Sequence, residues 1–326
     1  MSSLPAPARR RLTANFHFIK SCNFRCDYCY ATFADLVGRP VLPDEQLFEL
    51  TRRLARRHTK VTLVGGEPTL YRRLPDLLGA VKAEGALTNL VTNGSRIDVA
   101  WLQANAANLD FLTISIDSAS ADIQHLLGRA AHGGKTLSVE HYTTLADEAR
   151  RRGIVVKLNT VVTTRNQRDD MADLVRRLAP ERWKLLQAAP VEGQNDRFIA
   201  DLTPTRDEFD EYVARHRDAL TESEIRVVDE PIDMIRGSYI MVDPLGRFFD
   251  SADGTHRYSD PILDVGIDAA FAQVEFDPDK FHARAGDADY AARPDDTVGG
   301  VRVGERASTT TSPAALELAR YTLEGR

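Results

Sequence analysis

The sequence is poor in cysteine and has no long apolar run. Only three of its 326 residues are cysteines, and all three lie between positions 22 and 29. An odd number of cysteines in so short a segment excludes a disulfide framework and indicates a metal site. No part of residues 1–12 is apolar enough to act as a signal peptide or to span a membrane. We therefore expect a soluble, cytoplasmic protein with no membrane partner.

Positive charge is not in excess either. The chain has 42 Lys and Arg residues against 48 Asp and Glu residues, which gives a formal net charge of -6. This balance argues against a general affinity for nucleic acid, so an anionic ligand must be bound by a local group of cations. The length permits one large domain or two.

The sequence is instead rich in alternation between β-branched apolar runs and amphipathic stretches. This alternation is typical of parallel strands joined by helices. We expect helices at 43–57, 74–84, 99–106, 137–152 and 169–178. The strands between them are expected at 14–19, 61–64, 89–92, 111–116, 154–160 and 182–188. The fold class predicted is therefore α/β, with a partial (β/α)6 barrel over residues 14–190 after a short N-terminal tail, residues 1–13.

The pattern changes after Pro190. A long amphipathic helix is expected at 203–220, and strand-like pieces follow at 225–228 and 238–242. We interpret residues 191–290 as a C-terminal α/β extension that covers the substrate site of the barrel. Residues 291–326 combine Gly, Ser and Thr with few large apolar residues, which predicts a flexible tail. Within that tail, 313–321 could form a helix.

The cysteines have the spacing C-x3-C-x2-C. Cys22, Cys26 and Cys29 supply three thiolates, whereas a four-iron cubane ordinarily takes four, so one iron would be left without a protein ligand. An open iron is a site for a cofactor or substrate. The alternative is a zinc ion held by the same three thiolates and by a histidine such as His17.

This spacing resembles the cluster motif of the radical S-adenosylmethionine (SAM) superfamily. Residues 64–68, Val-Gly-Gly-Glu-Pro, resemble the second motif of that superfamily. The resemblance implies a 4Fe-4S cluster on the three cysteines and SAM on the open iron. It also implies SAM contacts from Gly65, Gly66 and Glu67. Glycines allow close approach of a backbone, and a carboxylate suits an ammonium group.

Small polar residues follow the next two expected strands. In α/β barrels the C-terminal ends of the strands line the active site. We therefore expect Asn93 and Ser118 to contact SAM, although each could instead cap a helix. Arg129 adds a cation that suits the SAM carboxylate, unless it is simply solvated.

Three cations and an amide lie on the last two expected strands of the barrel. Lys157 and Asn159 are two residues apart, as are Arg182 and Lys184, so each pair shares one strand face. Such cations are costly to bury against helices. Facing inward, they would form a site for several phosphate oxygens. The alternative is that one or two of them lie at exposed strand starts.

Taken together, the chain resembles the prokaryotic members of the viperin family, the antiviral radical SAM nucleotide dehydratases. The matching segments follow the family's order: 15–30, 65–68, 109–118, 127–129, 157–160, 182–184, 191–195, 238–243 and 262–266. The resemblance implies a lyase that converts CTP, UTP or GTP to the 3′-deoxy-3′,4′-didehydro nucleotide in defence against phage. The membrane-binding helix of the animal members has no counterpart in residues 1–13.

The resemblance also places Tyr239 near the nucleotide, as a substrate-binding and candidate catalytic residue, with core packing as its alternative. His17 is a second catalytic candidate, or else it fills the floor of the barrel. An electron donor such as a flavodoxin or ferredoxin is expected as a partner. Two other functions stay open: a radical SAM enzyme that modifies a peptide or cofactor precursor, and a non-catalytic zinc-binding module. Peptide-modifying relatives often carry further clusters, but no cysteine follows Cys29.

Overall fold

The computed structural model describes residues 10–284 and 286. These residues fall within one compact unit, Met1–Asp287, while the second unit, Ala288–Arg326, lies outside the described range. The expected tail at 291–326 and its helix at 313–321 are therefore outside the described residues. The first strand begins at Arg10, inside the segment expected to be an N-terminal tail.

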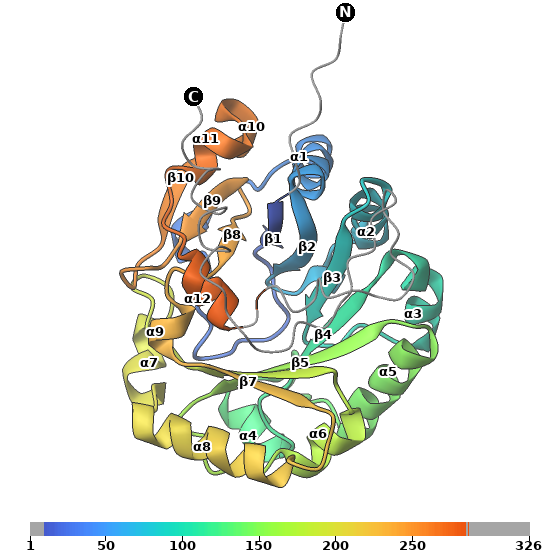
Figure 1. The fold of residues 1–326 in the computed structure, drawn as a ribbon, viewed down its shortest axis with the longest axis vertical. Coiled ribbons are helices and arrows are strands. Elements are labelled where there is room, and N and C mark those ends of the chain that lie inside the picture. The colour runs from blue at the N-terminus through green and yellow to red at the C-terminus, as the bar shows by residue number, and fades with distance from the viewer. Residues whose placement is uncertain (1–9, 285, 287–326) are drawn as a thin grey trace, which may run out of the picture. The chain divides into compact units, whose positions relative to one another are not determined.

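A curved parallel sheet forms the centre of the fold (Figure 1). Its first six strands are bonded in chain order and all run parallel, and they do not close into a complete barrel. The six expected strands are thus confirmed, with these bounds: β1 (Arg10–Ile19), β2 (His58–Gly65), β3 (Leu87–Thr92), β4 (Phe111–Ser115), β5 (Val155–Val162) and β6 (Arg182–Gln187).

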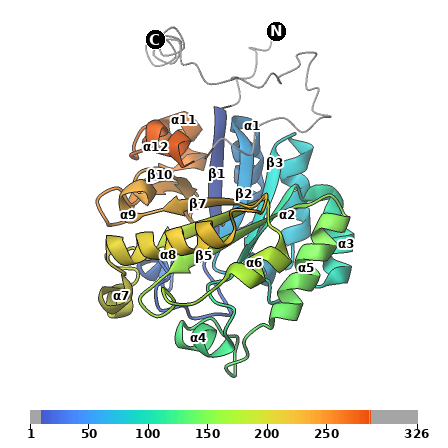
Figure 2. The same ribbon diagram turned by 60° about the horizontal axis from the view of Figure 1, so that its bottom comes forward.

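Helices cover the outer face of this sheet (Figure 1). In the first of them, Leu47, Leu50 and Leu54 recur at helical spacing and are buried, which is the apolar stripe that holds an amphipathic helix against a core. The five helices expected between the strands are present: α1 (Asp44–Arg57), α2 (Leu74–Ala83), α3 (Val99–Asn105), α5 (Val139–Arg151) and α6 (Ala172–Leu178). The sequence did not predict the short α4 (Ala121–Leu126), which lies at the end where the parallel strands finish (Figure 2).

The C-terminal extension builds onto the sheet of the barrel. Its strands continue the same sheet at both edges: β7 (Arg226–Glu230) pairs parallel with β6, and β8 (Ile240–Val242) pairs parallel with β1. The hairpin-like β9 (Arg247–Asp250) and β10 (Arg257–Pro261) follow, antiparallel, beyond β8. An open sheet leaves unpaired N–H and C=O groups at each edge, and these strands satisfy them.

The helices of the extension flank these added strands. The expected long helix is α8 (Arg206–Ala219), which begins at a capping box formed by Thr205 and Glu208. The shorter helices are α7 (Asp196–Leu202), α9 (Ile232–Ile235), α10 (Ile262–Val265), α11 (Ile267–Phe271) and α12 (Pro278–Ala283). No helix within residues 10–284 combines the length and apolar character needed to cross a membrane.

The inner face of the sheet is polar, unlike its outer face. Across three neighbouring strands, Asn89 Nδ2 donates to Thr62 Oγ1 (3.3 Å), and Thr113 Oγ1 donates to Asn89 Oδ1 (2.9 Å). Parallel strands buried on both sides are usually apolar on both faces. A polar inner face therefore indicates space for a polar ligand.

Candidate active site

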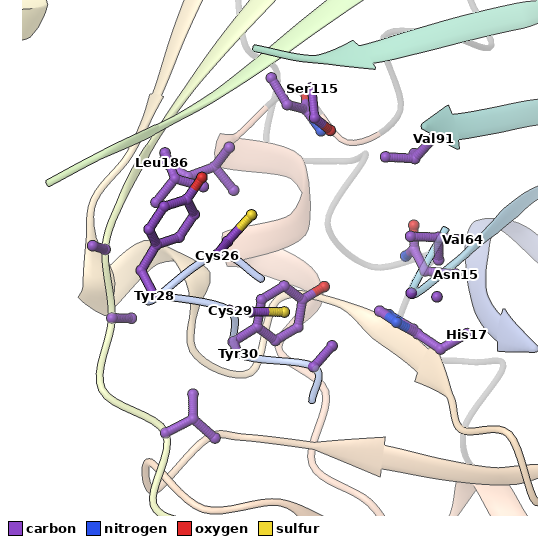
Figure 3. Close-up of a pocket in the computed structure, with 18 of the residues that line it drawn as sticks. Asn15, His17, Cys26, Tyr28, Cys29, Tyr30, Val64, Val91, Ser115 and Leu186 are labelled. Carbon is purple, nitrogen blue, oxygen red and sulfur yellow. The ribbon is translucent and has the colours of Figure 1, made fainter. Parts of the chain in front are cut away.

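A cavity opens at the C-terminal ends of the strands, as expected for an α/β barrel. It is lined by alternate residues of the strands and by part of the extension. It is also lined by the loop after β1 that carries Cys22, Cys26 and Cys29, called the cysteine loop below. Figure 3 shows the sulfurs of Cys26 and Cys29 facing this space, with Tyr30 between Cys29 and His17. Of the residues predicted for the site, those lining the cavity are His17, Cys22, Cys26, Cys29, Gly65, Gly66, Glu67, Asn93, Arg129, Asn159 and Tyr239.

The cysteine loop is held by backbone hydrogen bonds to the turn that follows α4. Arg25 N donates to Gly128 O (3.1 Å), and Asp27 N donates to Leu127 O (3.3 Å). Gly128 has a φ of +72°, and a Cβ there would lie 2.1 Å from Arg25 O, so only glycine fits. Burial raises the pKa of all three thiols, that of Cys26 to about 12. Metal uptake must therefore displace their protons.

The three cysteines are a donor set that fits a cubane. Within residues 10–284, no group of three or more His, Cys, Asp or Glu side chains converges on one metal position. A zinc ion needs four ligands around one point, whereas a cubane spreads its thiolates over separate irons. All three cysteines line one cavity, where their thiolates could bind a cubane.

The Gly65–Gly66 pair is required by the packing of the chain itself, beside the SAM contact expected of it. A Cβ at Gly65 would lie 2.2 Å from Ile19 O, and a Cβ at Gly66 would lie 2.1 Å from Ser21 O. Gly66 N donates to Ile19 O (2.6 Å). These glycines therefore let the end of β2 press against the chain entering the cysteine loop, so they position that loop whatever their contact with a ligand.

Glu67 organises the neighbouring strand end. Its carboxylate is buried and accepts bonds from Thr69 Oγ1 (2.6 Å), Thr92 Oγ1 (2.7 Å) and Asn93 N (2.8 Å). The Asn93 side chain in turn donates to Asn23 Oδ1 in the cysteine loop (2.9 Å). Glu67 and Asn93 thus lie together on the cavity wall, as the sequence predicted.

Arg129 lies on the cavity wall within a buried network. Its guanidinium forms an ion pair with Asp117 (2.9 Å), and Tyr28 also bonds to that carboxylate. Sequence analysis assigned no contact to Asp117 or to Tyr28. Ser118 does not line the cavity: it is fully buried and its hydroxyl bonds to Asp169, in the segment between β5 and α6.

The predicted cations all face the interior of the barrel, and none lies at an exposed strand start. Lys157, Arg182 and Lys184 are 1%, 7% and 6% exposed. They share a strand face with Asn159 and Leu186, which line the cavity, but they lie deeper and are not part of its lining.

Two further cations join this layer. Lys60 precedes Thr62 by two residues on the inner face of β2, and its ammonium lies 5.5 Å from the Phe111 ring centroid. The Lys157 ammonium lies 3.7 Å from the same centroid. The two-residue period of β2 would have revealed Lys60. Arg284, after α12, is too far away in sequence for any local pattern to have placed it.

A buried ionic network joins the cations to the extension. Glu230, at the end of β7, forms ion pairs with Lys184 and with Arg284 (3.5 Å), and it bonds to Tyr239. Tyr239 Oη lies 3.1 Å from Lys184 Nζ. Burial alone would raise the pKa of Glu230, but the two cations outweigh it and lower that pKa to about 2. Sequence analysis did not predict Glu230.

His17 lies against an aromatic wall. Its ring contacts Tyr30, Phe33 and Phe249 edge-on, at centroid distances of 5.9, 5.6 and 5.4 Å. The side chain is 1% exposed, and neither ring nitrogen has a hydrogen-bond partner among the described residues. Burial, with a smaller contribution from His256, lowers its pKa to about 3. His17 is therefore a neutral imidazole beside the cavity.

The low pKa of His17 predicts a pH-dependent stability. Below pH 6.5 His17 binds a proton in the unfolded chain but not in the folded protein. At pH 5 this difference lowers the free energy of unfolding by about 2 kcal/mol. Replacing His17 by Phe removes that loss. Urea unfolding at pH 7.5 and pH 5 should show the variant gaining about 2 kcal/mol relative to the parent at the lower pH. Parallel pH curves would contradict this, and exposed His125→Gln is the control.

Comparison with known proteins decides the family. The sequence profile of the Radical SAM superfamily matches residues 16–178. The S-adenosylmethionine-dependent nucleotide dehydratase of Flammeovirga pacifica is 38% identical over 280 residues, which cover 84% of this chain and 94% of that protein. This chain belongs to the radical SAM nucleotide dehydratases.

Other comparisons agree with this membership. The nucleotide dehydratase of Lacinutrix mariniflava is 42% identical over 279 residues, covering 84% of this chain and 58% of that longer protein. Among solved structures, anSMEcpe with bound AdoMet superposes with a TM-score of 0.62 at 16% identity, over 84% of this chain and 82% of that one. Streptococcus suis SuiB bound to S-adenosylmethionine gives 0.57 at 16%, over 73% and 59%. These two likenesses show the fold alone.

A radical SAM nucleotide dehydratase is an enzyme that uses a 4Fe-4S cluster and SAM. Cys22, Cys26 and Cys29 are the only cysteines of the chain and line one cavity, so they are the residues that would hold the cluster. Glu67, Asn93 and Arg129 line the same cavity and are the candidates for contacts with SAM.

Proposed function

We propose that this protein dehydrates a ribonucleoside triphosphate, CTP, UTP or GTP, to its 3′-deoxy-3′,4′-didehydro form, and that this activity serves defence against phage. The observation that carries the substrate class is the layer of buried cations beneath the cavity. Lys60, Lys157, Arg182, Lys184 and Arg284 are each at most 7% exposed. The names of the relatives support a nucleotide substrate.

The cations define the orientation of the substrate. A triphosphate held by Lys157, Arg182 and Lys184 would extend from the depth of the barrel toward the cysteine loop at the strand ends. Its ribose would then lie near Asn159 and Tyr239, which line the cavity between these two regions. Holding the remote phosphates in this way positions the reacting carbon without chemistry at the phosphates themselves.

When held by Cys22, Cys26 and Cys29, the cluster together with SAM would supply the radical chemistry that removes the hydrogen from C4′. The protein orients the ribose and excludes water, with the apolar ring wall beside His17 closing one side. Loss of the 3′-hydroxyl as water requires one proton, and one electron must then reach the sugar. We propose the Tyr239 hydroxyl as the group nearest to this step and neutral His17 as a hydrogen-bonding partner of the substrate. A flavodoxin or ferredoxin would supply the electrons.

The test is turnover with each triphosphate. Anaerobically reconstituted protein is mixed with dithionite, SAM and CTP, UTP, GTP or ATP. We expect 5′-deoxyadenosine together with a nucleotide lighter by one water for at least one of the first three. Cleavage of SAM without such a product from any triphosphate would contradict the proposal and favour a peptide or a cofactor precursor.

The cation layer can be tested in the same assay. Lys157→Ala should weaken triphosphate binding while uncoupled cleavage of SAM persists, because Lys157 lies below the cavity lining and away from the cysteines. Lys135→Ala, at an exposed lysine, is the matched control. Equal loss of both reactions in Lys157→Ala would argue against a phosphate role.

A further inference from the structure

The segment Val191–Asn195 joins the cysteine loop to the rest of the C-terminal extension. It begins four residues after the end of β6 and leads directly into α7. We propose that Asn195 and Gln194 in this segment are positioning residues for the cluster-binding loop, Asn195 by fixing the peptide that precedes Cys29. The proposal rests on the cluster of the family and is independent of the proposed nucleotide substrate.

The side-chain amide of Asn195 forms hydrogen bonds with three backbone groups. It is 5% exposed, and its Nδ2 donates to Tyr28 O (3.2 Å) and to Ala189 O (3.0 Å). Its Oδ1 accepts from Val191 N (3.0 Å). Two carbonyls on one side and one N–H on the other fix the orientation of the amide. Aspartate has the same shape, but it would place a carboxylate oxygen against both carbonyls.

The Tyr28 carbonyl belongs to the peptide that links Tyr28 to Cys29. The N–H of the same peptide donates to Cys26 O (3.2 Å). This peptide is therefore held on both sides, by the Cys26 backbone within the loop and by Asn195 from outside. Because it leads directly into the Cys29 Cα, its orientation sets where the Cys29 thiolate points.

Gln194 holds the next part of the same loop. Its Oε1 accepts from Phe33 N (2.7 Å) and lies 2.9 Å from Thr32 Oγ1. Phe33 has a φ of +50°, a left-handed conformation that non-glycine residues seldom adopt and that persists only where neighbours impose it. Gln194 is one such neighbour, so the loop after Cys29 is held at a second point.

The other side of the segment contacts the extension. Glu192 N donates to Gly254 O (2.8 Å), and Glu192 forms a parallel bridge with Thr255. The neighbouring Ser251 lines the cavity. The segment thus connects the cysteine loop with the part of the extension that borders the same cavity.

The experiment compares Asn195→Asp with Asn105→Asp. Asn105 is also 5% exposed, and its Nδ2 also donates to a backbone carbonyl, that of Trp101 (2.8 Å), but it lies on α3 away from the cavity. Each variant is reconstituted anaerobically and challenged with a chelator. The readouts are the rate of iron loss, the electron paramagnetic resonance spectrum of the reduced cluster with and without SAM, and the urea stability of the metal-free protein.

We expect Asn195→Asp to lose iron about 10- to 100-fold faster than the parent, the effect typical of residues that orient metal ligands. Its reduced spectrum with SAM should also change, while Asn105→Asp matches the parent in both. Iron loss and spectra equal to those of the parent would overturn the proposal, as would iron loss that only follows a shared drop in stability. If Asn195→Asp does not fold, Gln194→Leu is measured in the same way, and unchanged iron loss there overturns the proposal. None of these readouts uses a nucleotide, so they stand apart from the substrate test.

Discussion

Cys26→Ala is expected to abolish iron binding and the reductive cleavage of SAM together, while leaving the fold intact. The loop around Cys26 is held by backbone bonds from Arg25 and Asp27 to the turn after α4, and these do not involve the Cys26 side chain. With no cysteine outside residues 22–29, no other thiolate can replace it. Two thiolates would then have to hold a cubane that ordinarily takes four.

The measurement is iron and sulfide content after anaerobic reconstitution, followed by 5′-deoxyadenosine formation with dithionite and SAM. Exposed Thr221→Ala, just after α8 and outside the cavity lining, is the control for handling losses. Urea unfolding of the metal-free protein should give the same midpoint for parent and variant. A variant that keeps its iron and still cleaves SAM would remove Cys26 from the cluster.

Glu230→Ala should be the most destabilising single change in the cation layer. Glu230 is fully buried, and its carboxylate serves Lys184, Arg284 and Tyr239 at once. Removing it leaves the charges of Lys184 and Arg284 without this partner in the interior. Loss of one member of a buried ion pair typically costs about 3–5 kcal/mol, because the remaining charge stays desolvated. Urea unfolding near pH 7 measures this loss.

An anion should recover part of that stability. If the cation layer binds phosphates, inorganic tripolyphosphate can take the place of the missing carboxylate, and a ligand at 100 times its Kd adds about 2.7 kcal/mol. The gain should be larger in Glu230→Ala than in the parent, where the carboxylate already neutralises the site. Exposed Glu224→Ala is the matched control. A Glu230→Ala protein as stable as the parent without any anion would show that the pairs contribute little.

Much of the fold could be predicted because its signals are local. The six barrel strands and the helices between them, apart from α4, follow from periodicity within single elements. In the extension, β7 and β8 were also visible as apolar pieces, but not their places in the sheet, and β9 and β10 were not predicted at all. Edge pairing of β7 with β6 and of β8 with β1 joins segments whose partners no local pattern names.

The same distinction between local and long-range signals applies to the residues of the candidate site. Cys22, Cys26 and Cys29 were predictable because their spacing in one loop is itself the signal, and Lys157 and Lys184 because strand period places them on an inner face. Ser118 appeared equivalent to Asn93 in sequence, yet only Asn93 reaches the cavity. At the end of β4 the neighbouring Asp117 lines the cavity instead, and the Ser118 hydroxyl bonds to Asp169 on another segment.

The sequence by itself determined which chemistry is possible: three thiolates for a cubane, a glycine pair beside a carboxylate, and cations at a two-residue period. These follow from covalent spacing along the backbone, which no tertiary contact alters. Only the tertiary structure decided which charges meet. The Lys184–Glu230–Arg284 network and the bond from Asn195 to Tyr28 O join residues 46 to 167 positions apart. Such pairings exist only after the chain has packed, because buried polar groups must then find partners wherever the fold has placed them.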